Sequence, residues 1–103
     1  VCSSDLICVI NTIVTKVKKE KNLNIMLDIR NNIYKLLITC QQTDFIFKTL
    51  LMKFLKLFKN VEDKRYLINI CHEYQYKSIY GNRAVIFLEA FILHVLQRLY
   101  NLN

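Results

Sequence analysis

Apolar residues recur along this chain at the three- and four-residue spacing of amphipathic helices, in five segments separated by short polar stretches. These segments predict helices over residues 5–20, 25–40, 44–59, 61–80 and 82–100. No connection between them exceeds a few residues, so consecutive helices are expected to pack as mostly antiparallel neighbours. The predicted fold is therefore all-α, a compact bundle of about five helices.

Polar residues at the segment ends support these boundaries. Asn60 precedes the fourth segment and can cap it, and Glu62 and Asp63 follow in its first turn, where the helix dipole favours acidic groups. Thr43 takes the same capping position before the third segment. Gly81 can adopt the left-handed conformation that ends the fourth helix.

The third segment separates apolar from basic residues. One side of a helix built from it carries the apolar residues Ile46, Phe47, Leu50, Leu51, Phe54, Leu57 and Phe58. The other side carries Lys48, Lys53, Lys56 and Lys59. These four lysines are candidates for contact with DNA phosphates, although a solvated face is the more common role of such a pattern.

The fifth segment is apolar around nearly its whole circumference. One stripe contains Leu88, Ile92, Val95 and Leu99, and only His94, Gln97 and Arg98 form a polar sector. A helix of this kind is covered either by its own fold or by a partner.

Glu89 lies in the middle of this apolar segment. It would cost about 3 kcal/mol at the centre of a membrane helix, and the apolar run of residues 84–96 is short for a span, so burial in protein is preferred. A buried carboxylate needs a donor. The candidates are Lys77, Arg30, a helix N-terminal amide and a group on another subunit.

Composition agrees with a helical domain. The chain has 103 residues, of which 53% are hydrophobic, with no proline and one glycine, so it has few of the turn residues that a many-stranded β fold needs. We expect a single domain over residues 1–103. The net charge is +7, from 15 Lys and Arg against 8 Asp and Glu, which favours nucleic acid or another acidic partner.

No catalytic, cofactor-binding or metal-binding residue is predicted. One glycine cannot supply a Walker-type phosphate loop, and Cys71 and His72 are adjacent in a helix, so their side chains diverge. The four cysteines have no paired spacing typical of zinc or disulfide frameworks and are expected to be reduced, mostly buried thiols: Cys2, Cys8, Cys40 and Cys71.

Two stretches resemble the C-terminal region of replication factor C small subunits, the subunit 3 type of the eukaryotic sliding-clamp loader in particular. "GNRAVIFLEAFILHVL" is similar to that family's G-x-x-x-[IV]-x-x-LEAF helix. An R-x-x-[LI]-Y-x-L-L-x-x-C pattern is matched by Arg30, Ile33, Tyr34, Leu36, Leu37 and Cys40, and Asp44 and "IFKTLL" follow it. The resemblance covers residues 5–100.

The resemblance implies a collar domain, a five-helix unit that joins its counterparts in four other subunits in a closed ring. The ATPase modules of such a subunit lie upstream and are absent from this chain; they would hold ATP and Mg and most contacts with the sliding clamp and primer-template DNA. A nuclear, non-enzymatic oligomerisation domain with no membrane contact is therefore expected. The candidate subunit-interface residues are Phe91, Ile92, Val95, Leu99, Glu89, Arg83 and Leu88.

Two other interpretations remain open. An autonomous basic helical module could bind nucleic acid through its lysine faces, and this would show as salt-sensitive DNA binding. A helical adaptor unrelated to replication is the third. A phosphate-binding loop in the sequence upstream of this chain would favour the clamp loader over both.

Overall fold

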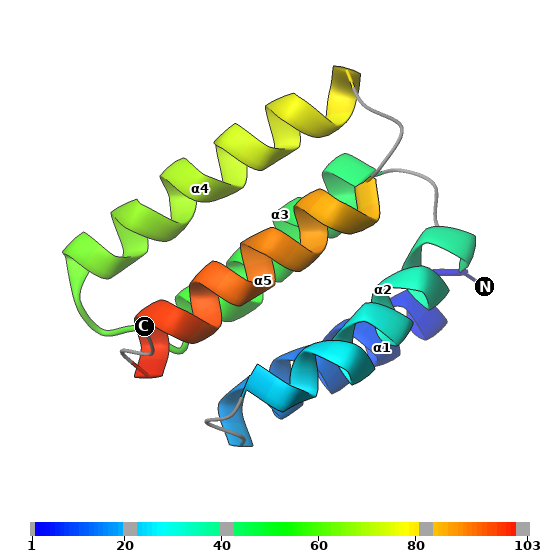
Figure 1. Cartoon of the computed structure of the whole chain (residues 1–103), viewed down its shortest axis with the longest axis horizontal. Coiled ribbons are helices and arrows are strands. Elements are labelled where there is room, and N and C mark those ends of the chain that lie inside the picture. Colours follow the sequence, from blue (N-terminus) through cyan, green and yellow to red (C-terminus); the bar gives the residue numbers. More distant parts are fainter. Residues whose placement is uncertain (1, 20–22, 40–42, 81–83, 101–103) are drawn as a thin grey trace.

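The computed structural model describes residues 2–19, 23–39, 43–80 and 84–100, and the described chain is helical with no strand (Figure 1). Its elements are α1 (Cys2–Lys19), the short 3₁₀ helix η1 (Leu23–Ile25), α2 (Met26–Thr39), α3 (Thr43–Leu55), α4 (Val61–Tyr80) and α5 (Ala84–Tyr100). The all-α prediction and its five helical segments are confirmed. Gly81, the predicted end of α4, lies outside the described residues.

The third helix ends at Leu55, four residues earlier than the apolar pattern predicts. The Leu57 amide donates to the Phe54 carbonyl at 2.9 Å, and the Phe58 amide donates to the Leu55 carbonyl at 3.3 Å. These three-residue turns are tighter than α-helical turns, and the side chain of Phe58 beyond them is buried in the core. The predicted extension of the helix to residue 59 was therefore wrong.

Asn60 caps α4 as its position predicts. Its side-chain oxygen accepts a hydrogen bond from the Glu62 amide at 3.1 Å, and its carbonyl accepts one from the Lys64 amide at 3.2 Å. The side chain thus satisfies an amide that has no partner inside the helix. A short connection with its own cap can turn the chain directly from α3 into α4.

The helices form two layers. In Figure 1, α5 lies between α4 on one side and α2 on the other, with α3 and α1 behind. The packing contacts agree, since α5 packs against α2, α3 and α4, while α1 packs against α2 and α3. This order places α2 and α4 on opposite sides of the central helix.

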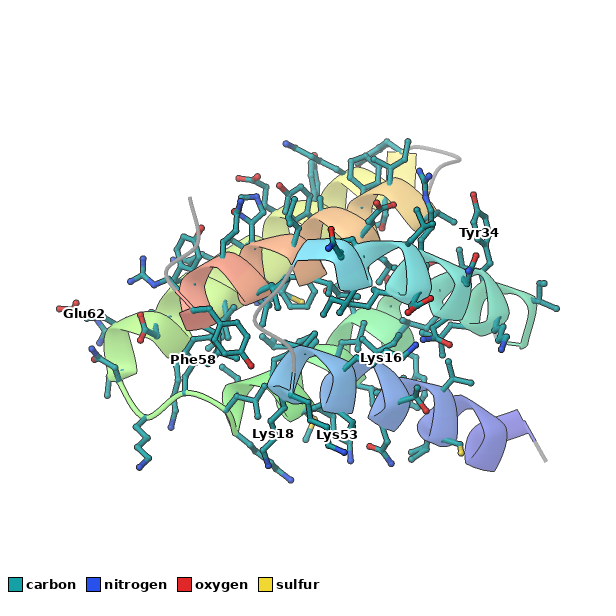
Figure 2. The ribbon with its side chains drawn as sticks, turned by 60° about the horizontal axis from the view of Figure 1, so that its bottom comes forward. Lys16, Lys18, Tyr34, Lys53, Phe58 and Glu62 are labelled. Atoms are coloured by element: carbon teal, nitrogen blue, oxygen red, sulfur yellow. The ribbon has the colours of Figure 1, made fainter. Side chains whose placement is uncertain are left out.

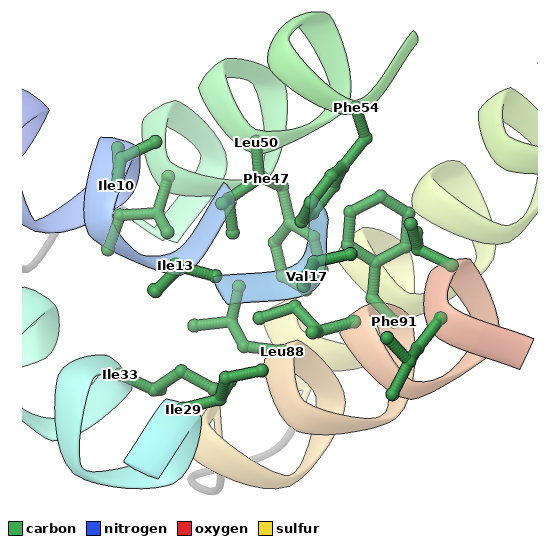
Figure 3. Packing of buried hydrophobic residues seen from close by; sticks show 14 of the residues in the cluster. Ile10, Ile13, Val17, Ile29, Ile33, Phe47, Leu50, Phe54, Leu88 and Phe91 are labelled. Carbon is green, nitrogen blue, oxygen red and sulfur yellow. The ribbon is translucent and has the colours of Figure 1, made fainter. Parts of the chain in front are cut away.

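The core is formed where the two layers meet. The ring of Phe91 in α5 lies 6.0 Å from the rings of both Phe47 and Phe54 in α3, and all three side chains are fully buried. Figure 3 shows apolar side chains from α1 and α2 pointing at the same centre, among them Ile10, Ile13, Val17, Ile29 and Ile33. One continuous core therefore joins all the helices.

Tyr100 connects the end of α5 to the end of α1. Its hydroxyl lies 2.5 Å from the carbonyl oxygen of Val17 and 2.6 Å from that of Lys18. Carbonyls in the last turn of a helix have no partner inside the helix, so a side-chain hydroxyl can satisfy them. Burial raises the pKa of Tyr100, which keeps the hydroxyl protonated and able to donate.

We expect Phe91→Ala to lower the free energy of unfolding by about 3–5 kcal/mol, because it leaves a cavity between two aromatic rings. Phe45→Ala removes the same side chain from an exposed position and should cost less than about 1 kcal/mol. Urea unfolding followed by circular dichroism measures both. Equal losses in the two variants would contradict the placement of Phe91 at the centre of the core.

Candidate subunit interfaces

Four of the predicted interface residues belong to the core of this chain. Their side chains have 0% exposure: Leu88, Phe91, Ile92 and Val95. A side chain that its own chain covers completely has no surface left for a neighbouring subunit. Their assignment to a subunit interface was therefore wrong, because the apolar circumference of α5 is covered largely by α2, α3 and α4.

The remaining predicted residues of α5 have other surroundings. Leu99 is half-buried and packs against the core, while Arg83 lies outside the described residues. Glu89 is 27% exposed and pairs with Arg30 of α2, with Oε2 3.0 Å from Nε. The expected donor is thus one of the two basic side chains that the sequence suggested, and it comes from the same chain.

The Arg30–Glu89 pair borders an apolar strip on the outer side of α5. Ile86 is exposed, and Ala90 and Leu93 follow it at helical spacing with partial exposure. Together with the ion pair they line a shallow depression of about 260 Å³ between α2 and α5. The depression is open to solvent and is bounded by one charged pair, so it is a surface feature rather than an enclosed ligand site.

Polar contacts hold α4 against the other side of α5. The Tyr74 hydroxyl lies 3.0 Å from Nε2 of His94, and the Tyr66 hydroxyl lies 3.4 Å from Nδ1. Arg98 donates to Asp63 at 2.7 Å. Both nitrogens of His94 therefore have partners within the chain, which agrees with a structural histidine rather than a metal ligand.

A row of exposed apolar residues follows the outer side of α2. Leu27 is 71% exposed, Tyr34 lies two helical turns later, and Ile38 is 82% exposed. We call these three residues the α2 patch. Ile29, Ile33 and Leu36 on the inner side of the same helix are fully buried. Exposed Asn31 lies between Leu27 and Tyr34 on the same side, so the row is not apolar throughout, but three large exposed apolar side chains on one side of a helix mark a candidate contact surface.

A second exposed apolar cluster lies at the end of α4 and the start of α3. Tyr76 and Tyr80 are one turn apart, and their rings meet edge to face at 5.2 Å. Ile79 and Phe45 are also exposed and line a depression of about 540 Å³ at the junction of the two helices. We call these four residues the α4 patch. Exposed tyrosines beside aliphatic side chains are typical of protein interfaces.

Neither patch contains any of the seven candidate interface residues named from the sequence. The signal was present in the helical spacing: Leu27, Tyr34 and Ile38 share the side of α2 opposite its buried residues, and Tyr76 and Tyr80 are four residues apart. Helices with apolar residues on two sides need two covering surfaces. Their exposure became evident only once the structure showed which side the fold covers.

The predicted lysines are distributed between α3 and the segment that follows it. Lys48 and Lys53 are on α3, and Lys56 and Lys59 lie beyond its end. All are exposed except Lys53, which is half-buried. The basic outer side is therefore confirmed in position, although its second half is not helical.

Cys71 and His72 diverge, as their adjacent positions predict. The thiol of Cys71 is buried and donates to the Phe47 carbonyl at 3.7 Å, while His72 is exposed. Burial raises the pKa of Cys71 to about 11, so the reactive thiolate is scarce near neutral pH. Cys8 is exposed, contrary to the expectation for most of the cysteines, and Cys40 and the side chain of Cys2 lie outside the described residues.

The described residues contain no group of three His, Cys, Asp or Glu side chains placed to hold a metal ion. Within the same part of the chain, no helix combines the length and apolar character needed to cross a membrane.

Residues 6–103 match the family model described as "Replication factor C subunit 3, C-terminal domain". The chain belongs to this family. The described parts of the two stretches that resemble this family lie in α2 and α5, the two helices that Arg30 and Glu89 join.

Two curated relatives agree with this membership. The chain is 30% identical over 93 residues to Replication factor C subunit 5 of Saccharomyces cerevisiae, which covers 89% of this chain and 26% of that protein. It is 29% identical over 83 residues to Replication factor C subunit 3 of Arabidopsis thaliana, which covers 78% of this chain and 22% of that protein. The chain thus spans about a quarter of the length of the curated relatives it matches.

We expect Arg30 and Glu89 to be coupled in a double-mutant cycle with alanine. Both side chains are partly exposed, so the coupling free energy should be about 0.3–1 kcal/mol at low salt and smaller at high salt. Lys35 lies on the same helix without an ion pair to Glu89, and the cycle of Lys35→Ala with Glu89→Ala should be additive. Urea unfolding of the six proteins tests this, and coupling that is absent at low salt would rule out the pair.

Proposed function

We propose that this chain is the oligomerisation domain through which a clamp-loader subunit joins the other subunits of its complex. Family membership supports a replication factor C subunit. Two exposed apolar patches, on α2 and α4 and on opposite sides of the central α5, are the main support for this proposal.

The position of the patches suits a member of a closed ring. A subunit in a ring of non-identical neighbours meets a different partner on each side, so it needs two distinct surfaces rather than one self-complementary surface. The α2 patch is aliphatic with one tyrosine, whereas the α4 patch is dominated by aromatic rings. Two chemically different surfaces on opposite sides of the domain allow two different neighbours.

The contacts beside α5 would keep these two surfaces at a constant relative angle. Arg30–Glu89 joins α2 to α5, and Asp63–Arg98 joins α4 to α5. Since the angle between two interfaces determines how many subunits close a ring, a rigid connection between them is part of the proposed function.

We further propose that the domain itself is not an enzyme. Nucleotide and Mg would be held by ATPase modules elsewhere in the full-length subunit, and contact with the sliding clamp and primer-template DNA would come mainly through the whole complex, in the nucleus. The buried thiol of Cys71 and the fully partnered His94 support a role in assembly rather than catalysis.

The test uses the full-length subunit, co-expressed with the other subunits of the complex. Tyr34→Glu with Ile38→Glu places charges on the α2 patch, and Ile79→Glu with Tyr80→Glu places them on the α4 patch. Each double variant should weaken binding to a different neighbour by more than about tenfold, because acidic groups would enter an apolar interface. Native mass spectrometry identifies the subunits that remain bound.

Met52→Glu is the matched control, since Met52 is exposed but belongs to neither patch. It should leave the complex intact. Circular dichroism of each variant shows whether the fold is kept. A complete complex with both double variants folded would refute the assignment of these patches.

A further inference from the structure

The net positive charge of this protein is concentrated on one side. Among described residues 7–19 and 43–60, on α1, on α3 and in the segment after α3, the charged side chains are one acid, Asp44, and seven lysines: Lys16, Lys18, Lys19, Lys48, Lys53, Lys56 and Lys59. The described parts of α2, α4 and α5 are nearly balanced. They carry Arg30, Lys35, Lys64, Arg65, Lys77 and Arg98 against Asp28, Glu62, Asp63, Glu73 and Glu89.

Packing brings most of these lysines onto one surface. Because α1 packs against α3, lysines from two helices distant in sequence are carried by adjacent elements. Figure 2 shows Lys18 and Lys53 along the same edge of the molecule. Lys16 is bound to Asp28 at 3.9 Å, so we define the lysine face by the six others: Lys18, Lys19, Lys48, Lys53, Lys56 and Lys59.

Among the described residues, no lysine of the lysine face has an acidic ion-pair partner. The ion pairs of the described residues are Lys16–Asp28, Arg30–Glu89, Lys77–Glu73 and Arg98–Asp63. None involves a lysine of this face. Six cations on adjacent elements without acidic partners repel one another, and an external polyanion would reduce that repulsion.

The surroundings of these lysines favour nucleic acid over an acidic protein. Protein interfaces contain an apolar or aromatic centre. On α1, on α3 and in the segment after α3, the exposed large apolar side chains of the described residues are Ile7, Phe45 and Met52. Of these, only Met52 lies within residues 15–19 and 48–59, which carry the lysines, and the exposed tyrosines lie on the other helices. Flexible ammonium groups without such a centre suit repeated contact with phosphates, which a duplex carries at about one per 1.7 Å of its axis.

We propose that the lysine face binds the phosphate backbone of nucleic acid without sequence preference. This surface shares no residue with the α2 patch or the α4 patch, although Lys48 lines the same depression as Phe45 and Ile79, so the inference goes beyond subunit assembly. In the full complex, such a contact would add electrostatic affinity for nucleic acid. The contact is electrostatic and needs no change in the fold.

The test measures binding of the chain to fluorescent DNA of about 20 nucleotides, single-stranded or duplex, by anisotropy between about 50 and 200 mM salt. The logarithm of the binding constant should fall linearly with the logarithm of salt concentration, with a slope of about −0.9 per phosphate contact on duplex or −0.7 on a single strand. Binding to either form supports the proposal. The form that binds more tightly shows whether the face prefers the phosphates of single-stranded or of duplex DNA.

The variant Lys18→Glu, Lys53→Glu, Lys56→Glu should weaken binding by more than about tenfold at low salt and make the slope shallower by about 2 to 3. Lys35→Glu, Lys64→Glu, Arg65→Glu is the matched control. It makes the same change in net charge on α2 and α4 and should weaken binding less than about threefold.

Three outcomes would overturn the proposal. The first is no binding at the lowest salt concentration, and the second is an equal loss in the control variant. The third is competition by polyglutamate as effective as that by unlabelled DNA, which would indicate an acidic protein partner instead. Circular dichroism and the assembly measurement of the preceding section, applied to the same variant, separate loss of this contact from loss of the fold or of the complex.

Discussion

Burial of α5 among α2, α3 and α4 is the constraint on which the rest of the structure depends. A helix that is apolar around most of its circumference cannot face water on several sides, since each exposed apolar surface has a free-energy cost proportional to its area. Phe91 occupies the centre of this arrangement, with Phe47 and Phe54 of α3 each 6.0 Å away. Covering α5 also separates α2 from α4, so the two exposed apolar patches lie on opposite sides.

Polar contacts restrict how α2 and α4 are oriented on α5. Arg30–Glu89 on one side of α5 and Asp63–Arg98 on the other are partly exposed, so each contributes modestly to stability. Their directional bonds nevertheless limit how α2 and α4 can slide along α5. The bonds from Tyr66 and Tyr74 to His94 do the same. In a domain whose proposed task is to present two surfaces at a constant angle, such contacts matter more for orientation than for free energy.

Apolar side chains and lysines occupy mostly separate regions of the surface. Apolar and aromatic side chains gather on the outer sides of α2 and α4, while unpaired lysines gather on α1, on α3 and just beyond α3. Apolar groups favour contact with protein, and unpaired cations favour contact with phosphate. The proposed contacts with neighbouring subunits and with a polyanion would therefore use mostly different residues, with Lys48 the exception, since it lines the same depression as Phe45 and Ile79 of the α4 patch.

The amino-acid sequence by itself determined the number and positions of the helices, the buried side of α3, the cap at Asn60 and the need of Glu89 for a donor. These properties follow from spacing along a helix, which is local. The tertiary structure decided what covers each apolar side: Leu88, Phe91, Ile92 and Val95 are covered by their own chain, while Leu27, Tyr34 and Ile38 are left exposed. It also ended α3 at Leu55, where three-residue turns replace the α-helical hydrogen bonds. Periodicity shows which residues avoid water, but the surface that covers them comes from residues far away in the sequence, as Phe47 does for Phe91.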